Sequence, residues 1–269
     1  MGTFSPPFVK SKQTAAHTPH RRIYLMDELR GFAVLCMIFY HAFYTMAYLF
    51  DIELGAALLR FFMPAEPFFA ALFIVISGIS SQFSHSNLKR GIKLFLVSLL
   101  LTAVTLVAVP EEAIRFGILH FLSVNMVLFG LLTPLLSKVP TLIGMLAAAL
   151  LYLLTFSVSS GVFGLPGLFS FDAPDLPFHL QFLFPSITQR GAYSADYFPL
   201  LPWSFVFLFG TFFGRVVRDK TWPEFVYKSH VPPLSWLGRW ALVVYVVHQP
   251  DVYKRQALPS SIFALEWVG

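Results

Sequence analysis

Long runs of apolar residues recur along the chain, and they constrain its fold more than any other feature. A helix of about 20 residues, with a rise of 1.5 Å per residue, spans the ~30 Å hydrocarbon core of a bilayer. Seven runs approach or reach this length, at residues 31–50, 67–83, 92–109, 116–136, 140–158, 199–217 and 236–250. The sequence therefore predicts an all-α integral membrane protein, a polytopic bundle of about seven transmembrane helices.

The scarcity of charge supports this fold class. Only 12% of the residues are charged and 57% are hydrophobic, whereas soluble globular domains carry about 25% charged residues. The net charge of +5 does not indicate nucleic-acid binding, because the basic residues lie between the apolar runs. Cys36 is the only cysteine in the chain, so we expect neither a disulfide framework nor a Cys/His metal site.

The distribution of lysine and arginine predicts the orientation of the helices. With the N-terminus in the cytoplasm, twelve basic residues of the N-terminal tail and of the segments between helices lie inside, and Arg30 and Arg239 lie at inner helix ends. Only five lie outside, namely Arg60, Arg115, Arg190, Lys254 and Arg255. The positive-inside rule then predicts a multi-pass protein of the inner (plasma) membrane with a cytoplasmic N-terminus and the bilayer as its surroundings.

The ends of the chain differ from its middle. Residues 1–22 are polar and predict a disordered cytoplasmic tail, while residues 23–250 form the transmembrane domain. The last apolar run is short and meets "DVYKRQ", with three charges in five residues, so we expect 251–269 to be an atypical, non-native tail.

Two further segments break the regular pattern of apolar runs. Residues 54–63 precede "PAEP" and predict an interfacial helix or the first half of the second helix. Residues 159–198 form one long outer segment, whose aromatic residues suggest that it packs on the membrane face.

The first apolar run carries a polar stripe. Arg30 and His41 are eleven residues apart, about three helical turns, and therefore share one face. Asp27 lies one turn before Arg30, and His41 lies roughly 16 Å deeper in the membrane. Ionisable groups at such depth usually face a cavity or a partner and mark a functional site. The alternative is a histidine bonded to a neighbouring helix and an Asp27–Arg30 pair that anchors the helix at the interface.

Further polar residues lie in or beside later apolar runs. His120 lies in "RFGILHFLSVN", and His248 with Gln249 lies near the outer end of the last run. Three intramembrane histidines in a chain with so few charges predict a shared polar chamber. For each histidine taken alone, the alternative is a side chain that only packs against its neighbours and has no functional role.

The sequence blocks that contain these residues resemble a known family. "DELRGFAVLCMIFYH", with Arg30 and His41 in R-x10-H spacing, is similar to the first-helix signature of transmembrane acyltransferases. The blocks "FIVISGISSQFSHSNLKRGIKL", "FGILHFLSVNMVLFGLL", "DYFPLLPWSFVFLFGTFFGR" and "LGRWALVVYVVHQP" resemble, in order, the bacterial family that is similar to the heparan-α-glucosaminide N-acetyltransferase catalytic domain. This resemblance covers about 22–250.

The resemblance implies transfer of an acetyl group from cytoplasmic acetyl-CoA to a hydroxyl or amine of an extracytoplasmic glycan or sugar. His41 would be the general base or a covalent carrier, and Arg30, fixed by Asp27, would hold a donor phosphate or stabilise developing charge. Basic residues on the inner side would bind the acetyl-CoA phosphates, and polar residues of the outer half would meet the acceptor. The predicted phosphate-binding residues are Lys89, Arg90 and Lys93. The predicted acceptor-binding residues are His120, Asp196, His248 and Gln249.

Two other functions use the same polar residues differently. A transporter or channel could pass an ion or solute through the chamber, but the sequence shows no inverted repeat and no matching pair of broken helices. A non-catalytic membrane scaffold would leave the intramembrane histidines unexplained.

Overall fold

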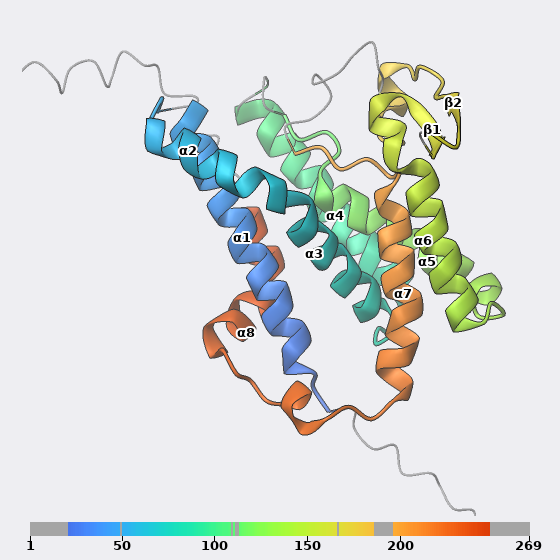
Figure 1. The fold of residues 1–269 in the computed structure, drawn as a ribbon. Coiled ribbons are helices and arrows are strands. Elements are labelled where there is room, and N and C mark those ends of the chain that lie inside the picture. The colour runs from blue at the N-terminus through green and yellow to red at the C-terminus, as the bar shows by residue number, and fades with distance from the viewer. Residues whose placement is uncertain are drawn as a thin grey trace, which may run out of the picture.

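Helices make up most of the computed structural model, which describes residues 21–48, 50–108, 110, 113–165, 167–185 and 196–247 (Figure 1). Eight α-helices lie within these ranges: α1 (Tyr24–Tyr48), α2 (Glu53–Phe62), α3 (Glu66–Ser81), α4 (Asn87–Ala108), α5 (Ile118–Leu136), α6 (Thr141–Thr155), α7 (Trp203–Asp219) and α8 (Pro232–Arg239). A helical segment over 241–247 follows α8. The predicted site residues His248 and Gln249, and the tail 251–269, lie outside the described residues.

Among the described residues, five helical segments are long and apolar enough to cross a membrane, which confirms a polytopic helical membrane protein. They are Tyr24–Tyr48, Glu53–Ser81, Asn87–Ala108, Ile118–Leu136 and Thr141–Ser160. The second is longer than predicted, because α2 and α3 join through a 3₁₀ turn at Met63–Ala65. Helix α7 occupies the sixth predicted run but has only 17 residues, and the seventh run is described only to residue 247.

The long outer segment predicted after α6 contains a short β-hairpin, which the predicted all-α fold class did not include. Strands β1 (Val162–Leu165) and β2 (Phe169–Asp172) form an antiparallel hairpin there. Gly164 and Gly167 adopt positive φ angles of 106° and 90°, which suit a tight reversal of the chain. The facing side chains of Phe163 and Phe171 stack with ring centroids 5.7 Å apart. Strands this short leave little periodicity in the sequence.

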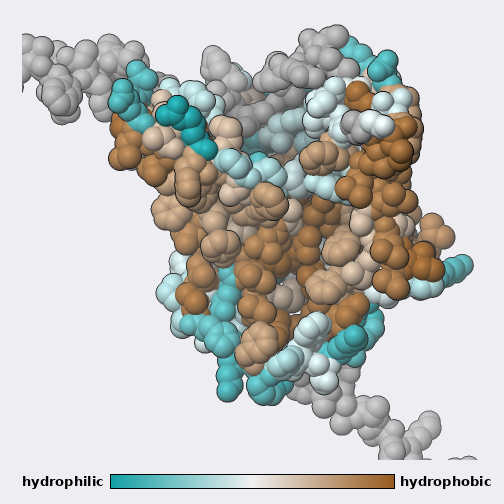
Figure 2. Space-filling model, viewed as in Figure 1, coloured by the Kyte–Doolittle hydropathy of each residue, from teal (hydrophilic) through white to brown (hydrophobic). Residues whose placement is uncertain are grey.

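The outer surface of the bundle is apolar between polar ends. Leu142, Leu146 and Leu150 follow one another at four-residue spacing on α6 and are 66%, 62% and 53% exposed. In water such a face would be unstable, whereas in a bilayer it contacts lipid. Figure 2 shows the same pattern, with hydrophobic residues across the middle of the visible face and hydrophilic residues toward both ends.

One end of the bundle collects most of the basic side chains. Hydrogen bonds connect the segments at this end. Arg215 of α7, for example, donates to the carbonyl of Leu136 at the end of α5 (2.8 Å) and to that of Val139 (2.9 Å). This basic end comprises residues 21–30, 80–93, 136–141 and 215–239. Of the fourteen described lysines and arginines, two (Arg60 and Arg115) lie elsewhere, and twelve belong to it: Arg21, Arg22, Arg30, Lys89, Arg90, Lys93, Lys138, Arg215, Arg218, Lys220, Lys228 and Arg239.

Glycines allow α8 to lie directly against α1. A Cβ atom at Gly238 would come within 1.8 Å of the Asp27 carbonyl oxygen, and one at Gly31 within 2.0 Å of the Leu234 carbonyl oxygen. Such close approach of backbones is how membrane helices associate without a hydrophobic driving force between them. It brings the start of α1 against α8 and the segment that follows it.

Glu28 of α1 caps the first turn of α8. Its Oε1 atom accepts hydrogen bonds from the backbone N–H groups of His230 (2.6 Å) and Val231 (2.8 Å) and from the hydroxyls of Ser229 (3.0 Å) and Ser235 (3.1 Å). Glu28 is only 6% exposed. A carboxylate in this place satisfies N–H groups that a helix leaves open and complements the positive end of its dipole.

Replacing this cap should destabilise the protein. Glu28→Ala leaves buried N–H and O–H donors without an acceptor, and we expect a loss of about 1–3 kcal/mol in the free energy of unfolding. The measurement is the thermal unfolding midpoint of the purified protein in detergent. Glu224→Ala is the matched control, because Glu224 and its partner Arg21 are both exposed and such pairs contribute little. The Arg21 guanidinium holds the pKa of Glu224 below its usual range. Equal midpoints for the two variants would contradict the capping role.

Candidate active site

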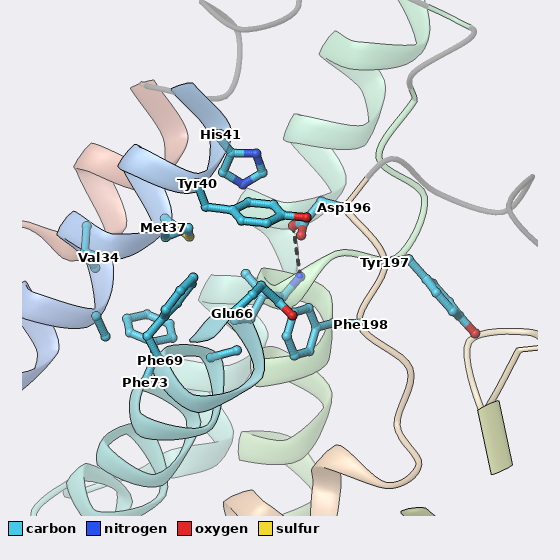
Figure 3. A pocket seen from close by; sticks show the side chains of 13 residues that line it. Val34, Met37, Tyr40, His41, Glu66, Phe69, Phe73, Asp196, Tyr197 and Phe198 are labelled. Carbon is cyan, nitrogen blue, oxygen red and sulfur yellow. Dashed lines mark hydrogen bonds between the residues drawn. The ribbon is translucent and has the colours of Figure 1, made fainter. Parts of the chain in front are cut away.

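A cavity of about 240 Å³ lies between α1, α3, the start of α5 and residues 196–198. We call it the acidic cavity, because the described residues that line it include two carboxylates and no lysine or arginine. Its polar lining residues are Tyr40, His41, Glu66, Asp196 and Tyr197, and its apolar ones are Ala33, Val34, Met37, Phe69, Ala70, Phe73, Ile118 and Phe198. Figure 3 shows these side chains converging from four separate segments.

Helix α1 carries His41 into this cavity. Residues 33, 37, 40 and 41 line the same wall, as expected from the spacing of three to four residues that defines one helix face. The His41 ring is half-buried and meets the Tyr40 ring edge-on, with centroids 5.6 Å apart. In Figure 3 the Tyr40 hydroxyl points toward Asp196, beneath the His41 ring. The mid-helix histidine therefore lies among polar groups inside the bundle.

Asp196 is held at the N-terminus of α5. Its Oδ2 atom accepts hydrogen bonds from the backbone N–H of Ile118 (3.2 Å) and from the Tyr245 hydroxyl. A Cβ atom at Gly117 would lie 2.4 Å from the same oxygen, so the close approach of the carboxylate requires glycine there. The open N–H groups and the dipole at a helix start both favour a carboxylate. Asp196 thus points into the cavity with a fixed position.

Glu66 is a site residue that the sequence analysis missed. It begins α3 and lines the acidic cavity together with His41 and Asp196. The signal was present, since Glu66 stands between two prolines and is the only acidic residue in the stretch 54–83. By the argument applied to the histidines, an ionisable residue within a spanning segment predicts a functional site.

A second cavity, of about 340 Å³, opens toward the basic end. We call it the basic cavity, because four cationic side chains line it: Arg30, Arg90, Lys93 and Arg239. The structure thus brings the predicted residues Arg90 and Lys93 together with Arg30 and adds Arg239. The third predicted donor residue, Lys89, is exposed and does not line this cavity.

Arg30 is fixed by contacts to two helices. One of its terminal nitrogens donates to Asp27 Oδ1 at 3.0 Å, and the other donates to Ser80 Oγ of α3 at 2.7 Å. Asp27 in turn accepts from Arg22 Nε at 2.8 Å. Asp27 therefore lies between two guanidinium groups, and charge-assisted bonds of this kind hold both the acid and Arg30 in place.

The two cavities share a wall. Phe73 lines both of them, and the neighbouring residues Ile118 and Leu119 line the acidic and the basic cavity respectively. Tyr245 lines the basic cavity and donates to Asp196 of the acidic cavity. Arg30 and His41, which were predicted on one face of α1, thus lie in adjoining cavities of opposite charge.

His120 lies apart from both cavities. It is 3% exposed, and its Nδ1 atom accepts a hydrogen bond from the Gly117 N–H at 3.4 Å. This contact assigns the ring proton to Nε2, which faces Thr102 Oγ1 at 3.1 Å, and Thr102 donates onward to the Ile114 carbonyl at 2.6 Å. The ring closes the N-terminus of α5 and fastens it to α4. Its predicted role at the acceptor stays a prediction.

The network around His120 should contribute mainly to stability. His120→Ala removes the partner of Thr102 and of a buried backbone N–H, and we expect a cost of about 1–3 kcal/mol. This role predicts a lower thermal unfolding midpoint for His120→Ala than for the control His179→Ala, which replaces an exposed residue. A His120→Ala protein of normal stability with a raised KM for the acceptor would instead favour the acceptor-binding role.

Comparison with known proteins places this arrangement in a family. The family described as heparan-alpha-glucosaminide N-acetyltransferase, catalytic, matches residues 22–250. The matched span includes all eight helices and both cavities. No curated protein and no solved structure matches the chain. The resemblance found in the sequence blocks is thereby confirmed.

Proposed function

Since this chain belongs to the heparan-alpha-glucosaminide N-acetyltransferase catalytic family, we propose that it acetylates an acceptor across the membrane. The donor is cytoplasmic acetyl-CoA, and the acceptor is a hydroxyl or amine of an extracytoplasmic glycan or sugar. The observation that carries this proposal is the meeting of two cavities of opposite charge inside one membrane-spanning bundle.

The basic cavity is the proposed donor side. Acetyl-CoA is an anion with several phosphate groups, and arginine and lysine bind phosphate by charge-assisted hydrogen bonds. Twelve of the fourteen described basic residues belong to the basic end, which the positive-inside rule assigns to the cytoplasm. The donor phosphates would stay at this end, with the thioester directed toward the wall at Phe73.

The acidic cavity is the proposed acceptor side. Glu66 and Asp196 can accept hydrogen bonds from sugar hydroxyls or pair with an ammonium group. The volume of about 240 Å³ lies below the roughly 300–1,000 Å³ of sites that enclose drug-sized ligands. This size favours an acceptor that inserts one sugar unit.

His41 is the proposed general base. Its neutral ring nitrogen takes the proton of the acceptor O–H or N–H as the acceptor atom adds to the acetyl carbonyl carbon. The carbon–sulfur bond then breaks, and the leaving thiolate takes that proton to give the CoA thiol. Imidazole suits such proton transfer near neutral pH. In the covalent alternative, acetyl would remain on His41 after acetyl-CoA is removed.

Two measurements test the function as a whole. Purified protein in proteoliposomes should consume acetyl-CoA and label a sugar acceptor added on the opposite side. Mass spectrometry of cell-envelope glycans from cells with and without the gene should identify the acetylated product. Solute flux through the vesicles without acetyl-CoA consumption would support the transporter alternative.

Loss of His41 should abolish transfer without impairing insertion. General bases typically contribute 10²–10⁴-fold, so His41→Ala should lower kcat by at least about 100-fold. Removing an ionisable group from a spanning helix should not hinder insertion, which size-exclusion chromatography can verify. The control is His85→Ala, an exposed histidine at the basic end. Near-normal transfer by His41→Ala would exclude this role.

Loss of Arg30 should act on donor binding. A hydrogen bond to a charged group contributes about 1.5–3 kcal/mol, so Arg30→Ala should raise the KM for acetyl-CoA by about tenfold or more. The kcat should fall less than in the His41 variant. Lys138→Ala, which removes an exposed charge from the same end, is the matched control. An unchanged KM with a large loss of kcat would move Arg30 from donor binding to the chemical step.

A further inference from the structure

One hydrogen bond crosses the wall between the two cavities. Tyr245 lines the basic cavity, and its hydroxyl donates to the carboxylate of Asp196, which lines the acidic cavity. The surrounding wall is apolar, since it is built from Phe73, Ile118 and Leu119. Tyr245 is only 2% exposed. The bond therefore joins a residue of the proposed donor side to a residue of the proposed acceptor side within an apolar partition.

Asp196 is held from several directions. Besides Tyr245, the Ile118 N–H donates to it, and Gly117 leaves just enough room for it. The next residue, Tyr197, donates from its hydroxyl to the carbonyl of Gln181, which is itself buried. Tyr245 reaches Asp196 from the side of the basic cavity.

The position of Tyr245 depends on α8. The helical segment 241–247 follows α8 after one turn residue, and α8 is fastened to α1 by the Glu28 cap and by the close approach at Gly238. Arg239 and Tyr245, before and within this segment, both line the basic cavity. The same short stretch thus forms the donor-side wall and restrains an acceptor-side carboxylate.

We propose that Tyr245 is a positioning residue that holds Asp196 across this wall, so that the pair closes the junction of the two cavities to water while the acetyl carbonyl still meets the acceptor atom. The proposal rests on the function proposed above. Closure keeps water of the acceptor side away from the thioester. Without it, water adds to the acetyl carbonyl carbon, the carbon–sulfur bond breaks, and acetate, the CoA thiol and a proton are released.

Hydrolysis of acetyl-CoA in the absence of acceptor tests the closure. Tyr245→Phe keeps the ring and removes the hydroxyl, and we expect the rate of thiol release to rise by about tenfold or more, the factor of one lost hydrogen bond to a charged group. Tyr152→Phe is the control, because Tyr152 lies on α6 and lines neither cavity. A rate equal to that of the unaltered protein, or a lower one, would overturn the proposal.

Cysteine labelling tests the closure independently of catalysis. In a Cys36→Ala background, Ala70→Cys places a thiol on the acidic cavity, and an impermeant thiol reagent is added from either side of oriented proteoliposomes. With Tyr245 present, we expect labelling only from the acceptor side; with Tyr245→Phe, labelling also from the basic end. Equal labelling from the basic end in both proteins would refute the closure.

The two proposals fail in distinguishable ways. Labelling that depends on Tyr245 in a protein that consumes no acetyl-CoA would refute the function and leave the closure standing. Should Tyr245→Phe fail to fold, Gly117→Ala replaces it, because the added Cβ would displace Asp196 from the opposite side. That variant should show the same gain of hydrolysis and of labelling from the basic end, and the absence of both would refute the closure.

Discussion

Charges within the hydrocarbon region of a bilayer must find partners in the protein, and this constraint organises the bundle. Arg30 joins Asp27 and Ser80, Glu28 caps α8, and Asp196 joins the start of α5 to Tyr245. The contacts of Arg30 with Ser80, of Glu28 with Val231 and of Asp196 with Ile118 connect segments that are distant in sequence. Because lipid offers no hydrogen bonds, breaking such a contact costs more than the contact itself contributes.

The same contacts hold basic and acidic side chains in separate cavities along the bundle. Cations line the cavity that opens toward the basic end, and carboxylates with a histidine line the cavity beyond Phe73. Such an arrangement suits a reaction in which an anionic donor and a hydroxylic or cationic acceptor approach from opposite sides. Helices α1, α3 and α5 each contribute to both cavities, and α1 supplies Arg30 to the basic cavity and His41 to the acidic cavity.

Helix α8 links the proposed chemistry to the architecture. It is short, and its first turn depends on a carboxylate from α1 rather than on a cap of its own. The segment that follows contributes Tyr245 to the wall between the cavities. A shift of α8 would therefore alter the basic cavity and the restraint on Asp196 together.

The sequence alone determined the membrane class and the family, and five of its seven predicted spans coincide with helical segments long enough to cross a membrane. It also predicted a functional role for the stripe that contains Arg30 and His41, which stays a prediction. These features depend on hydrophobic length and on the periodicity of single helices, which are local properties. Tertiary structure decided which polar residues meet. It placed Glu66 and Tyr245 beside Asp196, joined His120 to Thr102 and Gly117 by hydrogen bonds, and folded a hairpin after α6. Periodicity shows which face of a helix is polar, but a cavity arises from contacts between helices that are remote in sequence, and those contacts exist only in the packed bundle.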